Sequence, residues 1–301
     1  MQTHSPASSL QQWQNTGHYF QYREHRIFFQ DSASNKPTLL CIHGFPTASW
    51  DWYKLWPTLS TLFRVVTLDM IGFGFSDKPR DYHYSILDQA DLYTAFLKHL
   101  NIQSVHILAH DYGDTVTQEL MARQQQNPEF DIHSVCLLNG GLFPEVHRPR
   151  LVQTLLKSPI GKYLAPLLNE QRVSRSLRDV FAEKTQPSHQ ELQEFWQLIN
   201  YNNGIKIFYK LIEYMNERVQ HRQRWVGALQ QASMPVRFIN GLDDPISGKH
   251  MAERYVELVP NPDVVQLKGI GHYPQIEDDA QVLTALLEFY QAIGIIEPKS
   301  T

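Results

Sequence analysis

The chain contains 301 residues, of which 42% are hydrophobic and 19% charged, so it is long enough for one large α/β domain or for a domain with an insertion. Its formal net charge of −4 argues against nucleic acid as the main partner, because phosphate binding requires a concentration of Lys and Arg. No run approaches the roughly 18 apolar residues of a membrane span, so we expect no membrane-spanning segment.

The chain begins with a polar segment, residues 1–17, that is rich in Gln and Ser. This segment lacks the apolar core of a secretory signal, so nothing in it predicts export. We therefore expect a loosely ordered tail and a cytoplasmic protein.

Strands and helices alternate between residues 18 and 141. Short apolar runs predict strands, and the segment that starts at Ser85 predicts a capped helix ending near Leu100. The predicted strands are a hairpin at 18–29 and single strands at 38–42, 63–68, 105–108 and 133–138. Such alternation is typical of a mostly parallel sheet with helices on both faces.

The pattern changes at residue 142. From 142 to 233 the sequence shows amphipathic helical segments and no convincing strand, most clearly at 150–156, 190–199 and 205–218. Alternation of strand and helix resumes at 234 and continues to 295. We therefore predict an α/β core made of residues 18–141 and 234–295. Residues 142–233 are predicted to form a helical cap inserted over the carboxyl edge of the sheet, where open α/β sheets bind ligands.

The stretch from Ala109 to Gly113 predicts the chemistry. An apolar strand runs directly into Ala-His-Asp-Tyr-Gly and then into a helix, which gives the pattern small–x–acid–x–small. This is the pattern of a nucleophile elbow, a strand-to-helix turn so tight that only small residues fit beside the central one. The central residue is Asp111, whose carboxylate needs no base to activate it and suits attack on saturated carbon. The alternative is that Asp111 only caps the helix.

A carboxylate nucleophile forms an alkyl ester that must be hydrolysed, which requires a base, a group that orients the base, and donors for the oxyanion. His272 lies on a glycine-rich loop after the last predicted strand and is the candidate base. Asp243 and Asp244 follow the preceding strand, and both could instead be turn residues before Pro245.

The expected oxyanion donors are two backbone N–H groups. One belongs to Tyr112, directly after the nucleophile, and the other to Phe45 in the His-Gly-Phe-Pro loop. His43 and Asp69 are expected to hold loops rather than to act chemically. The sequence contains no Gly-x-Ser-x-Gly motif, which weighs against a serine esterase.

Four motifs together resemble those of α/β-hydrolases of the epoxide hydrolase and haloalkane dehalogenase group. They are His43–Pro46, Asp69–Ser76, His110–Gly113 and Gly271-His272. Within that group the chain is most similar to the mesoderm-specific transcript proteins, through His110–Asp114, Asn139–Pro149, Arg224–Leu229 and His272–Gln275. The resemblance runs from about residue 18 to 292. It implies an α/β-hydrolase fold and a catalytic triad of Asp111, His272 and, in preference to Asp243, Asp244. We expect neither a cofactor nor a metal ion.

Members of this group differ in the leaving group. Dehalogenases resemble one another in holding the halide with a Trp beside the nucleophile and an Asn or second Trp, whereas Tyr112 and Phe45 stand here. Epoxide hydrolases protonate the departing oxygen with cap tyrosines. The segment Tyr214–Arg218, followed by Trp225, resembles one that carries such a tyrosine, so Tyr214 is the candidate acid. The alternative is that Tyr214 only packs in the core. A second cap tyrosine is expected, and the options are Tyr163, Tyr201 and Tyr209.

The sequence therefore predicts a hydrolase most similar to an epoxide hydrolase, acting on a small apolar organic substrate and water. Asp111 would attack a substrate carbon, Tyr214 would protonate the departing oxygen, and water activated by His272 and Asp244 would free the product. The alternatives are a haloalkane dehalogenase, an ester or lactone hydrolase, and a non-catalytic ligand-binding or interaction protein on the same fold.

Overall fold

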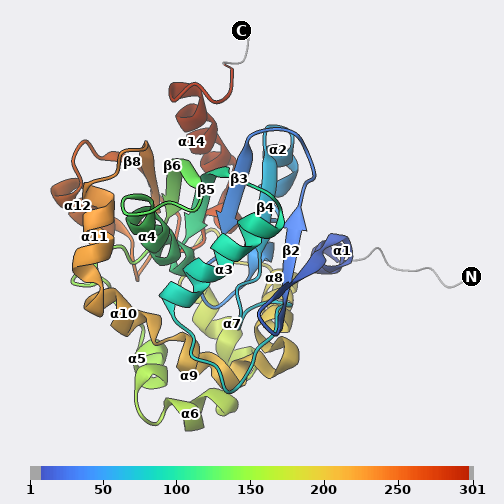
Figure 1. Cartoon of the computed structure of the whole chain (residues 1–301). Helices are drawn as coiled ribbons and strands as arrows, with labels where there is room; N and C mark the ends of the chain where they lie inside the picture. Colours follow the sequence, from blue (N-terminus) through green and yellow to red (C-terminus); the bar gives the residue numbers. More distant parts are fainter. Residues whose placement is uncertain (1–7, 298–301) are drawn as a thin grey trace, which may run out of the picture.

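A computed structural model describes residues 8–297 and shows an eight-stranded sheet between layers of helices (Figure 1). The strands lie in the order β1-β2-β4-β3-β5-β6-β7-β8. The pairs β1/β2 and β2/β4 are antiparallel, and all other neighbours pair in parallel. The strands are β1 (His18–Tyr22), β2 (His25–Asp31), β3 (Thr38–Ile42), β4 (Arg64–Leu68), β5 (Ser104–His110), β6 (Asp131–Leu138), β7 (Val236–Gly241) and β8 (Asp263–Leu267).

Strand β5 lies near the middle of the sheet and is buried along almost its whole length. Every residue of β5 after Ser104 is buried. A parallel strand covered by helices on both faces needs apolar side chains on both, which explains its nearly continuous apolar run. Two buried histidines interrupt this run: His106 shares a hydrogen bond of 2.8 Å with Ser134 Oγ on β6, and His110 Nε2 bonds to the carbonyl oxygen of His272 at 2.7 Å.

Helices cover both faces of the sheet (Figure 1). Helix α4 packs against α3 and α11 on one face, and α14 covers the other, where Tyr290 contacts the rings of Phe63 and His106. Ser85 caps α3 as expected, since its hydroxyl accepts the Asp88 N–H at 3.1 Å. The helices of the core are η1 (Ser49–Trp52), α2 (Trp56–Ser60), α3 (Ile86–His99), α4 (Tyr112–Gln124), α12 (Lys249–Leu258), α13 (Pro274–Glu277) and α14 (Asp279–Ala292).

Between β6 and β7 the described chain forms helices and loops only. We call residues 142–233 the insertion; most of its helices gather at one end of the sheet, and the last one, α11, packs against α4 (Figure 1). Its helices are α5 (Leu151–Lys157), α6 (Gly161–Leu164), η2 (Ala165–Leu167), α7 (Glu170–Arg178), α8 (His189–Asn200), η3 (Tyr201–Ile207), α9 (Phe208–Leu211), α10 (Tyr214–Gln220) and α11 (Arg222–Gln230).

The expectation of one helical segment over 205–218 is wrong, because the chain there divides among η3, α9 and α10. Between α9 and α10 the N–H groups of Glu213 and Met215 bond to carbonyls three residues back, which tightens the turn. Apolar spacing continues across such a break, so periodicity alone does not reveal it.

The expectation of a loosely ordered tail is wrong for its described part, because Ser9–Thr16 forms helix α1. Leu10 and Trp13 are buried, and the Trp13 indole N–H donates to Ser49 Oγ at 3.2 Å. The Leu10 N–H donates to Glu194 on α8 at 3.3 Å, so α1 contacts both the core and the insertion. Two apolar residues in a polar segment gave too weak a pattern to predict this packing. Residues 1–7 of the predicted tail lie outside the described residues.

Within residues 8–297, every helix is too short or too polar to cross a bilayer.

Candidate active site

Asp111 occupies the turn between β5 and α4 in a strained backbone conformation, with φ of 48° and ψ of −103°. The turn is crowded by neighbouring backbone. A β-carbon at Gly113 would lie 2.3 Å from the carbonyl oxygen of Ile42, and one at Gly44 would lie 3.1 Å from the β-carbon of Asp111. This crowding is the physical reason for the small residues that the elbow pattern requires.

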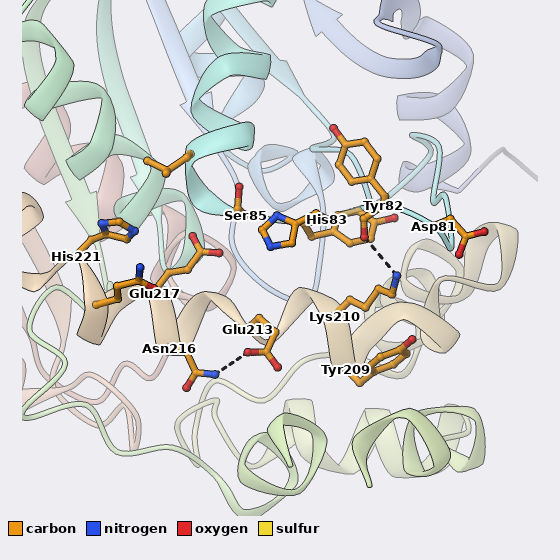
Figure 2. Close-up of a pocket in the computed structure, with 13 residues that line it drawn as sticks. Asp81, Tyr82, His83, Ser85, Tyr209, Lys210, Glu213, Asn216, Glu217 and His221 are labelled. Carbon is orange, nitrogen blue, oxygen red and sulfur yellow. Dashed lines mark hydrogen bonds between the residues drawn. The ribbon is translucent and has the colours of Figure 1, made fainter. Parts of the chain in front are cut away.

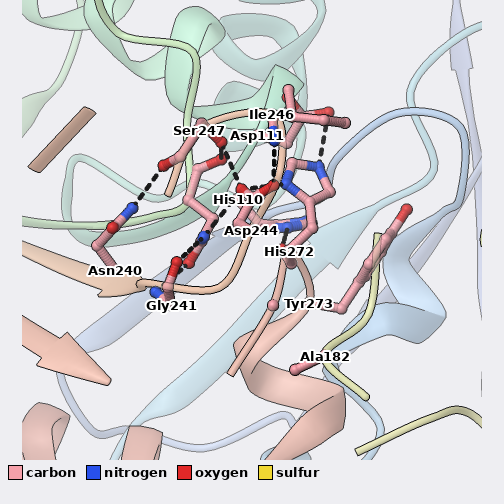
Figure 3. Close-up of polar contacts among 12 residues, drawn as sticks. His110, Asp111, Ala182, Asn240, Gly241, Asp244, Ile246, Ser247, His272 and Tyr273 are labelled. Atoms are coloured by element: carbon pink, nitrogen blue, oxygen red, sulfur yellow. Dashed lines mark hydrogen bonds and ion pairs between the residues drawn. The ribbon is translucent and has the colours of Figure 1, made fainter. Parts of the chain in front are cut away.

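His272 lies between Asp111 and Asp244 (Figure 3). Its Nδ1 donates to Asp244 Oδ2 at 2.8 Å, which turns Nε2 toward Asp111 Oδ2 at 3.9 Å. The three residues follow different strands, β5, β7 and β8, and meet because parallel strands end at the same edge of the sheet. The structure thus brings together the three side chains that the sequence selected for a triad.

Asp244 is fixed by several donors besides His272. It accepts hydrogen bonds from Asn139 Nδ2 at 3.0 Å, Ser247 Oγ at 2.7 Å and the Ile246 N–H at 2.7 Å (Figure 3). Burial raises the pKa of this carboxyl, but the charge of His272 and these hydrogen bonds outweigh burial and lower the pKa to about 2. Asp243, the other option from the sequence, is exposed.

The electrostatics of the site keep Asp111 ionised and His272 protonated at neutral pH. Burial raises the pKa of Asp111, but the positive charges of His272 and Arg218 outweigh burial and hold the pKa below its usual value. Burial lowers the pKa of His272, yet the carboxylates of Asp244 and Asp111 raise it to about 9. At neutral pH, therefore, an imidazolium lies between two carboxylates.

The pKa of His272 gives a direct prediction. NMR titration of its ring should show a pKa near 9 in the wild type, and this pKa should fall in the Asp244→Asn variant because the main charge that raises it is removed. Because the folded-state pKa lies above the ordinary value of 6.5, the charged imidazole contributes stability that is full below pH 6.5 and is lost as pH rises toward 9. An unchanged His272 pKa in the variant would contradict this account.

One of the two expected oxyanion donors already contacts the nucleophile. The Phe45 N–H donates to Asp111 Oδ2 at 3.2 Å. Tyr112 is the first residue of α4, where backbone N–H groups have no partner within the helix and can face an anion.

Tyr214 lies on α10 and is buried against Phe45 and Tyr112, the two residues with the expected oxyanion donors. Its ring centroid is 5.9 Å from that of Phe45 and 4.8 Å from that of Tyr112. Burial and the charge of Asp111 raise the pKa of its phenol, with Arg218 opposing them, so the hydroxyl stays protonated at neutral pH. Its contacts fit both readings from the sequence, a proton donor and a packed core ring.

Sequence reasoning missed Arg218, which the structure places against Asp111. Arg218 Nη2 donates to the backbone oxygen of Asp111 at 3.0 Å and lies 3.4 Å from its Oδ1. The guanidinium also lies 4.5 Å from the centroid of the Tyr214 ring. The one signal in the sequence was the spacing of four residues from Tyr214, which puts both side chains on the same face of α10.

Arg218 also explains part of the Asn-Gly-Gly motif that follows β6. A β-carbon at Gly141 would lie 2.2 Å from Arg218 Nη1, and one at Gly140 would lie 2.1 Å from Asp114 Oδ2. Both glycines are therefore required by polar side chains that approach the backbone closely.

A cavity of about 80 Å³ lies between the core and the insertion, next to the triad. It reaches His272 and Phe45, but neither Asp111 nor Tyr214 lines it. The other lining residues are mostly apolar: Pro46, Arg150, Val152, Gln153, Leu156, Leu168, Arg172, Val173, Ser176, Leu177, Val180, Phe208, Ile246 and Tyr273. This volume is below the roughly 300 Å³ of common ligand sites, so a larger substrate requires the insertion to move.

None of the three options for a second cap tyrosine lines this cavity. Tyr163 is 66% exposed, and Tyr201 packs against Phe75 with Lys78 above its ring. Tyr209 lines a wider open groove of about 850 Å³ on the outer side of α9 and α10 (Figure 2).

That groove is separated from the triad by α10. Glu213, directly before this helix, and Asn216 and Glu217 within it line the groove (Figure 2). Tyr214 and Arg218 face the opposite way, toward Phe45 and Asp111. The groove is therefore distinct from the candidate active site despite its larger size.

His43 and Asp69 hold loops, in line with their expected role. His43 Nε2 accepts the Met70 N–H at 3.0 Å, and Asp69 accepts the N–H groups of Ser49 at 2.8 Å and Phe75 at 2.6 Å. Among residues 8–297, no group of three or more His, Cys, Asp or Glu side chains is arranged to hold a metal ion.

Comparison with known proteins gives three similarities that cover most of the chain. The family described as alpha/beta hydrolase fold matches residues 37–279. The mesoderm-specific transcript homolog protein of Bos taurus is 45% identical over 299 residues, covering 95% of this chain and 88% of that protein. The putative hydrolase LipZ of Mycobacterium tuberculosis is 38% identical over 270 residues, covering 89% and 93%.

A solved structure shows the same fold at low sequence identity. The crystal structure of haloalkane dehalogenase DbeA from Bradyrhizobium elkani matches with a TM-score of 0.77 and 19% identity, covering 92% of this chain and 98% of that one. The similarities agree with the resemblance expected from the motifs.

Proposed function

Because the chain belongs to the alpha/beta hydrolase fold family and has mesoderm-specific transcript proteins among its relatives, we propose that it is a hydrolase with an aspartate nucleophile, similar to epoxide hydrolases. The observation that carries the proposal is the position of His272, with Nε2 3.9 Å from Asp111 and Nδ1 2.8 Å from Asp244. A carboxylate stands where serine hydrolases place a hydroxyl.

In the first step, a carboxylate oxygen of Asp111 attacks an epoxide carbon. A bond forms between that oxygen and the carbon while the epoxide C–O bond breaks, and its electron pair moves to the epoxide oxygen. Tyr214 gives its phenol proton to this oxygen. The result is an alkyl ester on Asp111.

His272 changes its protonation state during this step. Esterification removes the negative charge of Asp111, which is one of the causes of the high pKa of His272, so that pKa falls. The imidazolium proton then restores the phenol of Tyr214. His272 thereby becomes the neutral base that hydrolysis requires, and no proton is drawn from solvent.

In the second step, neutral His272 takes a proton from a water molecule that adds to the ester carbonyl of Asp111. The backbone N–H groups of Phe45 and Tyr112 stabilise the oxyanion. The intermediate collapses as its bond to the alkyl oxygen breaks, and the leaving alkoxide takes the proton of the added hydroxyl and departs as the diol. Asp111 is again a carboxylate and His272 an imidazolium.

The side chains around Asp111 favour an oxygen leaving group over a halide. Halide binding uses N–H donors, which the side chains of Tyr112 and Phe45 lack, and the Trp225 indole N–H is already donated to Glu119 at 2.8 Å. The guanidinium of Arg218 is the exception, and it makes haloalkane dehalogenation the second candidate function.

The Tyr214→Phe variant tests the leaving group. Conversion of a terminal epoxide to its diol should fall on the order of 10²–10⁴-fold, because the departing alkoxide loses its proton donor. Release of halide from a 1-haloalkane should not change, because halide leaves without a proton. Diol is measured by gas chromatography and halide by ion chromatography, and Tyr209→Phe, on the outer groove, is the matched control.

The wild type and Asp111→Asn should be assayed with the same panel of epoxides and haloalkanes. Diol formation that depends on Asp111 supports the proposal. Halide release without diol would replace it with dehalogenation. Absence of both products would leave a ligand-binding protein on a hydrolase fold.

A further inference from the structure

Arg218 is a buried cation that the reaction described above does not use. Its side chain is 3% exposed, and its Nε donates to Thr115 Oγ1 at 2.7 Å. Nη2 contacts Asp111, but Nη1 has no hydrogen-bond partner among the described residues. A buried charged donor without an acceptor is costly, which indicates that a group from outside the chain completes its contacts.

Asp111 is the carboxylate that compensates this cation. The two side chains form an ion pair at 3.4 Å, and Arg218 forms no other ion pair within residues 8–297. Asp114 forms no ion pair with Arg218 among the described residues, and burial and the charge of Asp111 raise the pKa of its carboxyl well above the ordinary value despite Arg218. Arg218 therefore depends on the charge of the nucleophile.

Esterification removes that charge. Arg218 would then be a buried cation without a counter-ion, an arrangement that proteins strongly disfavour. The same step moves the electron pair of the breaking bond to the substrate oxygen, which carries negative charge until Tyr214 gives it a proton. A substrate can also bring its own carboxylate.

We propose that Arg218 is an anion-binding residue that holds a negatively charged substrate oxygen beside the attacked carbon as Asp111 becomes an ester. The inference rests on the proposed attack by Asp111. The Phe45 N–H donates to Oδ2 of Asp111, whereas Oδ1 of Asp111 lies beside Arg218. Oδ1 is therefore the carboxylate oxygen outside the proposed oxyanion site. A carbon bonded to Oδ1 lies next to Arg218.

His147 adds a second polar group to the same place. A β-carbon at Gly141 would lie 2.2 Å from Arg218 Nη1 and 3.0 Å from His147 Nδ1, so both nitrogens converge there. Neither ring nitrogen of His147 has a hydrogen-bond partner in the described chain. The proposed ligand chemistry is thus an anionic oxygen, whether it is the departing alkoxide or a carboxylate carried by the substrate.

The Asp111→Asn variant tests the inference without turnover, since it removes the carboxylate charge as the ester does. Isothermal titration calorimetry should show acetate binding to Asp111→Asn at least about tenfold tighter than to the wild type or to Asp111→Asn/Arg218→Met. Asp111→Asn/Arg218→Lys, which keeps the cation, should retain part of this binding. Circular dichroism verifies folding, and Arg218→Gln replaces the Met variant where that one does not fold.

Two results would overturn the inference. One is acetate binding that is absent from Asp111→Asn or equal with and without Arg218. The other is binding that appears only when Asp114→Asn is added, because Asp114 would then supply the counter-charge.

A second measurement identifies the source of the anion. In a His272→Gln background, mass spectrometry follows adduct formation on Asp111 with a neutral terminal epoxide and with a 2,3-epoxy carboxylate of equal length. Arg218→Met should slow the reaction of both substrates on the order of 10²-fold if the departing oxygen is held, and that of the carboxylate alone if the substrate carries the anion. Rates of adduct formation that are unchanged by replacement of Arg218, with both substrates, would refute the inference. Absence of any adduct on Asp111 would refute the proposed function and leave the acetate result standing.

Discussion

Replacement of Asp111 by Asn should reduce kcat/KM for any substrate that the wild type converts by about 10⁴-fold or more. The side chain keeps its size and can still accept the Phe45 N–H, but a neutral amide oxygen is a poor nucleophile toward saturated carbon. Product formation with the best substrate of the epoxide and haloalkane panel measures the effect. Circular dichroism and the thermal midpoint verify that the fold is intact.

The matched control is Asp243→Asn. Asp243 is an exposed carboxylate beside the acid of the triad, and its replacement should leave turnover within about twofold. An Asp111→Asn variant that keeps more than a tenth of wild-type activity would contradict the proposed nucleophile and favour the reading of Asp111 as a helix cap.

Replacement of His272 by Gln should separate the two steps. The variant lacks the base for water, so hydrolysis of the ester should slow by about 10³-fold or more while Asp111 remains free to attack. The substrate should therefore accumulate on the enzyme. Mass spectrometry of the intact protein and of its peptides should show the added mass on Asp111.

The control for this trap is the double variant His272→Gln/Asp111→Asn, which should show no adduct. An adduct on any other residue would contradict the mechanism. So would the absence of an adduct with a substrate that the wild type turns over.

The sequence was sufficient for the fold and for most of the candidate site, for a physical reason. Asp111, Asp244 and His272 each directly follow a strand on a short motif, so local chemistry identifies them and the parallel sheet brings them together. The preference for Asp244 over Asp243 came from family resemblance, and the structure supplies its cause in the donors that surround the buried carboxylate.

Arg218 could not be found in this way. It contacts Asp111 across 107 positions of sequence, and only the packing of the insertion on the sheet brings them together. An arginine in a polar helical segment is ordinarily a solvated side chain, so its residue type gave no sign of burial. For the same reason α1 was missed, since its helix is anchored by Trp13 to a distant serine rather than by its own sequence pattern.

Helix α1 links the insertion to the core. Ser9 and Leu10 bond to Glu194 of the insertion, while Trp13, about one turn further along the helix, bonds to Ser49 of the core. If the insertion moves away from the core to admit a substrate, the hydrogen bonds of α1 to one of the two sides must break. The rate of product release would then depend partly on α1, although this helix contributes no reacting atom.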